Sequence, residues 1–351
     1  MYFFASFFLL LACNKENLDA ALETRGNDNH KNWKLANASG GWDYTTTDGG
    51  SGAGYGVDTY TYGCSRPYGR AIASSSHYEE DGNVLWDIHR TMTYNDNFKV
   101  AEESSDETGT EIIRTFNYDS EGKFTGVTTV VDGVALEDEF KFDDQGRVLE
   151  YTNEGVKTEY IWKGDNIKEF RIYVQPEEEM ALIQKSNAFN FIGYDDKSRT
   201  QAKKQVLKSL AFIQKQAKNT YRSKQTEWQL VLIEEIEVDN NIIQPFSSPG
   251  AGYPGSIGDG GWLFKTKNFM TKFTDYPINP DGSKGEISYQ AHNHTVATKD
   301  NLPENVIYSL YIHEIAQDAD GNAINWNETG TIHYDYISGC NETSELKSKI
   351  K

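Results

Sequence analysis

The chain has 351 residues, of which 37% are hydrophobic and 13% are aromatic, including 21 Tyr, 17 Phe and 7 Trp. Its 53 acidic and 34 basic residues leave a net charge of −19, and a field of that sign makes nucleic acid a poor partner, because phosphate binding needs a positive face. The length allows one large domain or two ordinary ones, and the abundance of Tyr favours strands over helices. These numbers indicate a globular protein, mainly β, without a nucleic-acid partner.

The chain begins with an apolar stretch that ends at a cysteine. No residue from Tyr2 to Ala12 is charged, and this run is too short for a membrane-spanning helix, which needs about 20 apolar residues, but has the length of the apolar part of a signal peptide. Residues 10–13, LLAC, resemble the lipobox of bacterial lipoproteins, in which the leader is cut before the Cys and the Cys is acylated. The resemblance implies a signal peptide over 1–12 and a lipidated Cys13. An ordinary secretory leader that is cut elsewhere is the alternative.

The stretch after this cysteine is polar. Residues 13–32 are rich in Asn, Asp and Glu and lack an apolar period, which predicts a flexible tether between a membrane and the folded region. By the lipoprotein resemblance, Asn14 in place of Asp argues against retention in the inner membrane. The expected location is therefore the outer membrane, on its periplasmic or cell-surface side. The lipid on Cys13 would attach the protein to this membrane.

Two further cysteines, Cys64 and Cys340, stand near the beginning and the end of the expected folded region. An exported protein meets an oxidising compartment, in which a pair of cysteines can form a disulfide. If Cys13 is lipidated, these two can pair only with each other. Two separate buried thiols are the alternative.

Two glycine-rich stretches, Asp48–Gly56 and Ser247–Gly261, are interpreted as loops. The first contains glycines at every second position, but no Lys-Ser or Lys-Thr follows and no helix pattern begins there. A phosphate-binding loop needs backbone amides that lead into a helix N-terminus. The first stretch is therefore predicted to be a flexible hairpin connection.

Three short motifs share one pattern: an aromatic residue, an acid, two polar residues, a glycine and a polar or basic residue. They are residues 78–83, 118–123 and 142–147, with degenerate copies at 94–95 and 162–165. The pattern predicts a hairpin in which the aromatic residue ends a strand, the acid caps the turn and the glycine takes a positive φ. The motifs resemble the YD repeats of Rhs-type proteins over about 78–173, which implies a ladder of stacked hairpins. Unrelated hairpins in an ordinary β domain are the alternative.

A helical insertion is predicted at about 176–224. The Pro and three Glu of 176–179 suit the first turn of a short helix. From Arg199 to Lys224 apolar residues recur at helical spacing, and eight basic residues occur without an acid. This basic face is either a solvated surface that offsets the acidic charge of the protein or a contact for anionic lipid or a partner.

Strands are predicted again from Thr226, over 228–238, 305–317 and 322–338. His292 and His294 would point to one face of a strand, as a zinc pair needs, with His313 or Glu314 as a third ligand. The sequence around them fits neither a metalloprotease helix nor a cupin pattern. We interpret these histidines as solvent-facing and expect no metal and no other cofactor.

The fold class predicted from the sequence is mainly β, an antiparallel hairpin or meander sheet with one helical insertion. The expected regions are a signal peptide (1–12), a tether (13–32), a β hairpin-repeat region (33–175), the helical insertion (176–225), a β-rich C-terminal region (226–340) and a polar tail (341–351).

We expect a non-catalytic, lipid-anchored envelope protein that binds a glycan or a protein partner through an aromatic-rich β surface, because Trp and Tyr on a rigid sheet suit sugar rings and peptide side chains alike. One alternative is an exported hydrolase with a metal at His292 and His294 or with paired carboxylates such as Asp143 and Asp144, although neighbouring residues of a strand point to opposite faces. Another alternative is an envelope carrier that holds a lipid-like ligand inside a closed barrel. No residue is assigned a catalytic role.

Overall fold

Alternation of apolar and polar residues gives almost every described segment the period of a strand. The computed structural model describes residues 33–64, 70–96, 100–107, 110–122, 124–136, 138–145, 147–153, 156–175, 228–245, 266–317, 320–338 and 340. Over these ranges the chain forms seventeen strands and no α-helix. The strands are β1 (Lys34–Thr46), β2 (Ser51–Tyr62), β3 (Ala71–Glu80), β4 (Asn83–Tyr94), β5 (Val100–Glu107), β6 (Thr110–Tyr118), β7 (Phe124–Val131), β8 (Val134–Leu136), β9 (Asp138–Phe142), β10 (Val148–Asn153), β11 (Val156–Lys163), β12 (Asn166–Val174), β13 (Gln229–Ile243), β14 (Asn268–Pro277), β15 (Tyr289–Lys299), β16 (Leu302–Gln317) and β17 (Ala323–Ile337).

Several predicted regions lie outside the described residues. These are the signal peptide (1–12), the tether (13–32), the helical insertion (176–224) with its basic face, the loop at 247–261 and the polar tail (341–351). In the part of the chain that is described, no helix is long and apolar enough to cross a membrane.

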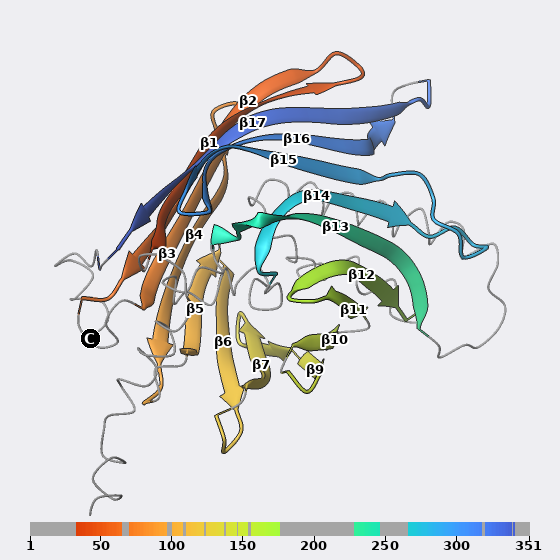
Figure 1. The fold of residues 1–351 in the computed structure, drawn as a ribbon. Coiled ribbons are helices and arrows are strands. Elements are labelled where there is room, and N and C mark those ends of the chain that lie inside the picture. Colours follow the sequence, from red (N-terminus) through yellow and green to blue (C-terminus); the bar gives the residue numbers. More distant parts are fainter. Residues whose placement is uncertain are drawn as a thin grey trace, which may run out of the picture.

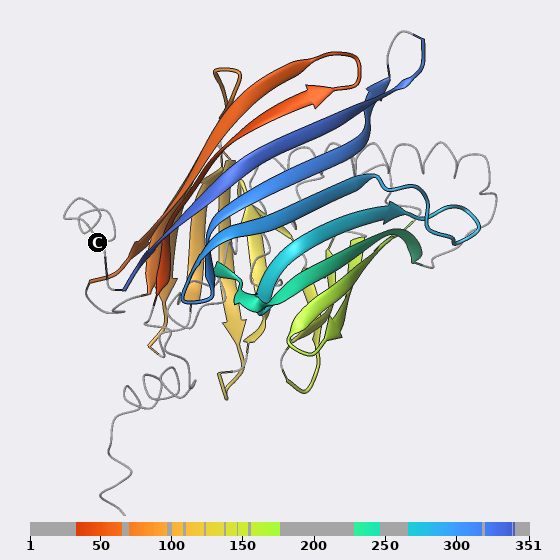
Figure 2. The same ribbon diagram turned by 45° about the horizontal axis from the view of Figure 1, so that its top comes forward.

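The mainly β, antiparallel meander predicted from the sequence is confirmed. Nearly every strand pairs with the next strand along the chain, and β1 pairs with both β2 and β17. The two β regions belong to one sheet, since β12 pairs with β13 across the gap between 175 and 228. Figures 1 and 2 show this sheet as one strongly curved surface, with the C-terminal strands β15–β17 beside β1 and β2.

The two ends of the sheet meet where β7 and β9 approach each other. Among the strands described, β8 pairs only with β7, and β9 pairs only with β10. Aromatic side chains fill this junction: the ring of Phe124 on β7 lies 6.3 Å from that of Phe140 and 5.8 Å from that of Phe142. Side-chain packing therefore holds these ends together where no backbone ladder joins them.

The sheet has a buried inner face and a water-facing outer face. On β17 the buried residues include Trp326, Glu328 and Tyr334, whereas the alternating positions carry exposed residues such as Thr329 and Asp335. Such alternation is expected of an antiparallel sheet with one face on the core and the other in water. Core residues from β10 to β17 form the larger cluster on the inner face.

The predicted turn pattern is confirmed in detail at the second of the three motifs, whereas in the first motif Tyr78 does not end the strand, because β3 continues to Glu80. Gly82 and Gly122 both have φ of 77°, and Gly122 follows Tyr118, which ends β6. In the second motif the carboxylate of Asp119 accepts a hydrogen bond from the backbone N–H of Glu121 at 2.9 Å. Acid and glycine thus make the turn, as the motif implies.

The glycines of 51–56 do not form a loop, which corrects the prediction made for that stretch. The turn covers only residues 47–50, and Gly52, Gly54 and Gly56 lie within β2. A Cβ at Gly54 would enter the indole of Trp42, and one at Gly56 would enter the ring of Tyr78. These glycines are needed because aromatic rings of neighbouring strands lie flat against the backbone of β2.

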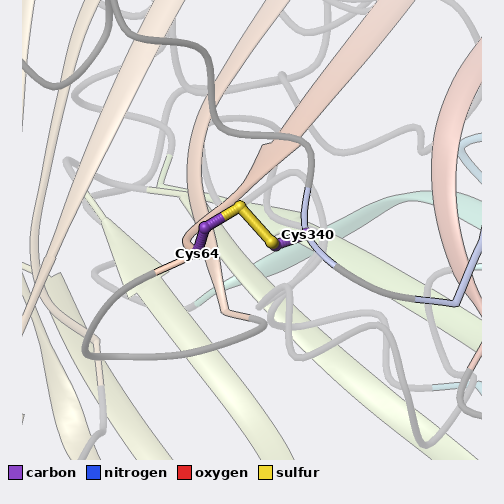
Figure 3. The surroundings of a disulfide bond; sticks show 2 residues. All are labelled: Cys64 and Cys340. Atoms are coloured by element: carbon purple, nitrogen blue, oxygen red, sulfur yellow. A yellow bond between two sulfur atoms is a disulfide. The ribbon is translucent and has the colours of Figure 1, made fainter.

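A disulfide joins the beginning of the described region to its end (Figure 3). Cys64 follows β2 and Cys340 follows β17, and their Cα atoms lie 5.1 Å apart although 276 residues separate them in sequence. Because β1 lies between β2 and β17 in the sheet, the bridge connects the strands on either side of β1.

Candidate functional site: a buried acid pair on the inner face

The histidines considered as metal ligands lie on the outer face. His292 and His294 are both exposed on β15 and point the same way, as expected of alternate strand positions. The Nε2 atom of His292 lies 2.8 Å from the side-chain oxygen of Gln290, and Nδ1 of His313 lies 3.2 Å from the hydroxyl of Tyr311. Across the described ranges, no three His, Cys, Asp or Glu side chains are grouped so that they could hold a metal ion.

Asp143 serves a hairpin turn rather than a pair with Asp144. Its Oδ1 accepts hydrogen bonds from the backbone N–H groups of Gln145 and Arg147, both at 2.9 Å, and its Oδ2 lies 2.6 Å from Nε of Arg147. Partial desolvation raises the pKa of Asp143, but these hydrogen bonds outweigh it and lower the pKa overall. Asp144 is exposed, so the two acids do not form a catalytic pair.

Most aromatic side chains of the described residues are buried or half-buried. Tyr55, at 51% exposure, is the one Phe, Tyr or Trp side chain of the described set that is classed as exposed. Burying aromatic rings contributes more to stability than leaving them in water. The fully buried aromatic side chains therefore gather mainly in the core clusters of the inner face.

The sequence did not predict a site at Glu234 and Asp275, which are called the acid pair below. Glu234 lies opposite Asp275 in the antiparallel register of β13 and β14. Both point to the inner face, with exposures of 4% and 2%. Side chains directly opposite each other in such a pair have Cβ atoms about 5 Å apart, so the two carboxyl groups are close neighbours.

Aromatic rings flank the acid pair along the same row of the sheet. Phe170 of β12 stands opposite Glu234, and Tyr160 of β11 stands opposite Phe170. On the other side Tyr289 of β15 stands opposite Asp275. The rings of Tyr160 and Phe170 meet edge to face with centroids 5.0 Å apart. The acid pair thus lies in an apolar, aromatic setting.

This setting raises the pKa of Glu234, of Asp275 and of Tyr160. Burial raises the pKa of Glu234 to about 8. Burial, and then the neighbouring Glu234, raise the pKa of Asp275, and the same two causes raise that of Tyr160. Tyr160 lies in the same row as Glu234, with Phe170 of β12 between them. At neutral pH the acid pair is held mainly in its protonated form.

The acid pair also has hydrogen-bonding capacity that the described residues leave unused. Oδ1 of Asp275 and the hydroxyl of Tyr160 are buried and have no hydrogen-bond partner. An unsatisfied buried polar group costs roughly 1–3 kcal/mol. Such groups are uncommon in folded proteins, and two of them in one row of the inner face mark this row as a candidate binding site.

Other buried acids on the inner face have partners. Glu328 receives hydrogen bonds from the hydroxyl of Tyr308 at 2.8 Å and from Nε1 of Trp326 at 3.1 Å. Glu103 forms an ion pair with Arg114 at 2.9 Å. These contacts are structural, whereas the row that contains Glu234 and Asp275 supplies no basic side chain.

The sequence did contain a signal for Glu234. Within the predicted strand 228–238, Leu232, Glu234 and Ile236 occupy alternate positions, so Glu234 is a charged residue in an apolar face. The pairing with Asp275 could not be read in this way, because it depends on the register between two strands separated by 24 residues of chain.

Comparison with known proteins places the chain in no family. No protein-family model matches it, and no curated protein matches it. Among solved structures, the outer membrane protein Omp33 of Acinetobacter baumannii aligns with a TM-score of 0.30 and 4% identity, over 86% of this chain and 99% of that one. The Tc holotoxin pore of Photorhabdus luminescens aligns with a TM-score of 0.27 and 9% identity, over 76% of this chain and 11% of that one.

A third solved structure, a beta-barrel-like protein of a domain of unknown function from Brucella abortus, aligns with a TM-score of 0.19 and 11% identity. It covers 86% of this chain and 99% of the other chain. Likenesses at these TM-scores carry no argument about the fold or the function of this protein.

Proposed function

We propose that the protein is a lipid-anchored protein of the outer membrane that binds a ligand on the inner face of its sheet and performs no chemistry on it. The proposed location rests on the leader and on its LLAC motif at 10–13. The proposed binding role rests on the acid pair, whose buried groups have unused hydrogen-bonding capacity among aromatic rings. Buried polar groups cost stability unless they are satisfied, so a ligand that satisfies them would account for their presence.

The direction of the aromatic side chains bears on the class of ligand. Aromatic rings suit sugar rings and peptide side chains, but here they line a concave surface rather than an exposed one. This orientation favours a small ligand, or one terminal group of a glycan or peptide, over a broad protein–protein contact. It also favours the carrier of a lipid-like ligand as the second candidate function.

A hydrolase is less well supported. Carboxyl pairs in glycosidases work because one carboxyl is protonated while the other is ionised. Here the pKa values of Glu234 and of Asp275 are both raised by burial, so the acid pair lacks an ionised member near pH 7. Neither acid donates to or accepts from a histidine in the described hydrogen bonds.

Native mass spectrometry of the mature protein, extracted gently from envelope membranes, tests the proposal. We expect a bound molecule of discrete mass that is absent from a Glu234→Gln variant. Glu237→Gln is the matched control, because Glu237 lies on the same strand but is exposed on the outer face. Hydrolysis of chromogenic ester or glycoside substrates by the wild type, lost in Glu234→Gln but not in Glu237→Gln, would overturn the non-catalytic assignment.

A further inference from the structure

The acid pair lacks a positive counterpart among the side chains that face it. Its row contains Phe170 on one side and Tyr289 on the other, and the inner-face neighbours along its own strands are Leu232, Ile236 and Phe273. Among the described residues, no Lys, Arg or His influences the pKa of Glu234 or of Asp275. Two buried acids without a described cation can be matched by one positive charge from a ligand.

We propose that Glu234, Asp275 and Tyr160 bind a primary ammonium group, and that this group belongs to the inner-face ligand. The inference rests on the proposed function, which supplies that ligand. An ammonium group has three N–H donors. The site offers three matching acceptors, namely a carboxylate oxygen of Glu234, Oδ1 of Asp275 and the phenolic oxygen of Tyr160. Oδ1 of Asp275 and the hydroxyl of Tyr160 have no other partner among the described residues.

Charge balance supports the same class of ligand. One positive charge offsets one carboxylate, and a buried ion pair is tolerated only when hydrogen bonds satisfy its remaining atoms. Tyr160, Phe170 and Tyr289 lie in the same row as the acid pair, and aromatic faces attract cations. A neutral hydroxyl group would supply no charge, and a quaternary ammonium group would supply no N–H donors.

A metal ion fits this position less well. Calcium takes six to eight oxygen ligands, and zinc takes at least three protein ligands. In the described ranges no third metal-ligating side chain joins Glu234 and Asp275. The rings of Phe170 and Tyr289 occupy the places in the row from which further ligands would come.

The proposal predicts that binding depends on pH. The acid pair must lose a proton to hold a cation, and the pKa of Glu234 is about 8. Below pH 8 the affinity should therefore fall about tenfold per pH unit. A primary amine with a pKa near about 10 stays protonated over this range, so the change reports the protein and not the ligand.

Isothermal titration of the full mature protein in detergent micelles with n-hexylamine tests the inference, with empty micelles as the blank. We expect saturable binding at pH 8 that weakens about fiftyfold at pH 6, because half of Glu234 is ionised at its pKa and about 1% is ionised two pH units lower, and no binding of 1-hexanol or hexyltrimethylammonium. Glu234→Gln should abolish binding, and Glu237→Gln should leave it unchanged. Tyr160→Phe, which removes one oxygen and keeps the ring, should weaken binding about tenfold.

Two results would overturn the inference while leaving the proposed function intact. One is equal binding of hexylamine by the wild type and by Glu234→Gln. The other is binding of 1-hexanol as tight as that of hexylamine. A third combination would also separate the two proposals. If a ligand co-purifies with the wild type and is lost from Glu234→Gln, but the wild type binds no amine, the proposed binding function is supported and the ammonium group is refuted.

The ammonium group has a second conceivable source, a lysine of this chain. Dicyclohexylcarbodiimide activates buried protonated carboxyl groups and joins them to an adjacent amine, with loss of water to the reagent. Treatment without added amine, followed by peptide mapping, should leave Glu234 and Asp275 free of any lysine cross-link. A cross-link from either residue to a lysine of the chain would support the ammonium chemistry but overturn the ligand as its source.

Discussion

Two carboxyl groups face each other across β13 and β14 at a depth where water does not reach them. Burial favours the neutral form of an acid, and each acid disfavours ionisation of the other. The folded state therefore holds protons that the unfolded chain would release near pH 4.5. The stability of the protein must then depend on pH through Glu234.

We expect the wild type to lose stability as pH rises from 4.5 to 8. The pKa of Glu234 is raised from 4.5 to about 8 on folding, so its contribution is complete below pH 4.5 and is lost progressively up to pH 8. One pKa unit corresponds to about 1.4 kcal/mol, so the loss amounts to several kcal/mol. Glu234→Gln should reduce this slope in urea unfolding measured at pH 5, 7 and 9, and Asp275, whose pKa burial also raises, should account for the slope that remains.

Glu237→Gln provides the comparison for that experiment. It removes an acid from the same strand, but its side chain is exposed and lies 3.4 Å from Lys272. The free energy of unfolding of Glu237→Gln should change with pH as steeply as that of the wild type. A wild-type protein as stable at pH 9 as at pH 5 would contradict the assignment of a raised pKa to Glu234.

At the scale of the element, the strands and hairpins followed from local sequence, and their partners across the sheet did not. Alternation and the aromatic–acid–glycine motif are properties of a few consecutive residues, so the turns at Gly82 and Gly122 could be predicted. The role of Gly54 depends on Trp42, which arrives from β1. A glycine run without its partner strand reads as a loop, which is why that interpretation was wrong.

Gly54→Val should destabilise the protein by about 1–3 kcal/mol, the usual cost of overpacking. Valine suits a strand, but a Cβ at this position enters the indole of Trp42, and the ring must move. Gly41→Ala is the control, since a Cβ there meets nothing nearer than the backbone oxygen of Gly54 at 3.6 Å. Equal unfolding midpoints in urea for both variants would count against close packing of Trp42 on β2.

At the scale of the whole molecule, strand pairings between distant segments join the two β regions into one sheet. The sequence left open whether the two β regions form one sheet or two, because the pairings of β1 with β17 and of β12 with β13 join segments far apart in sequence. Acidic residues placed by such pairings, like Asp275 opposite Glu234, could not be found from periodicity. The inner face, and with it the candidate site, exists only in the assembled sheet.

The disulfide between Cys64 and Cys340 should contribute to the stability of this assembly. It closes a loop of 276 residues, and cross-links over long loops restrict the unfolded chain most, with typical contributions of about 2–5 kcal/mol. Cys64→Ser and Cys340→Ser should each lower the urea midpoint, and the double variant should lower it no further. A double variant that is additive, or two thiols that react freely in the unreduced, denatured wild type, would contradict the bridge.

The lipid anchor proposed at Cys13 decides where the folded sheet is held. If the leader is cut before Cys13 and the thiol is acylated, attachment comes from the acyl chains, since each buried CH₂ contributes about 0.8 kcal/mol and two chains suffice for stable anchoring. Cys13→Ser should prevent acylation and leave residues 1–12 on the protein. Growth with an alkynyl fatty acid, followed by mass analysis, should show label on the wild type and none on the variant. Equal labelling of both proteins, or no labelling of the wild type, would remove the basis for an outer-membrane location while leaving the acid pair and its ligand untouched.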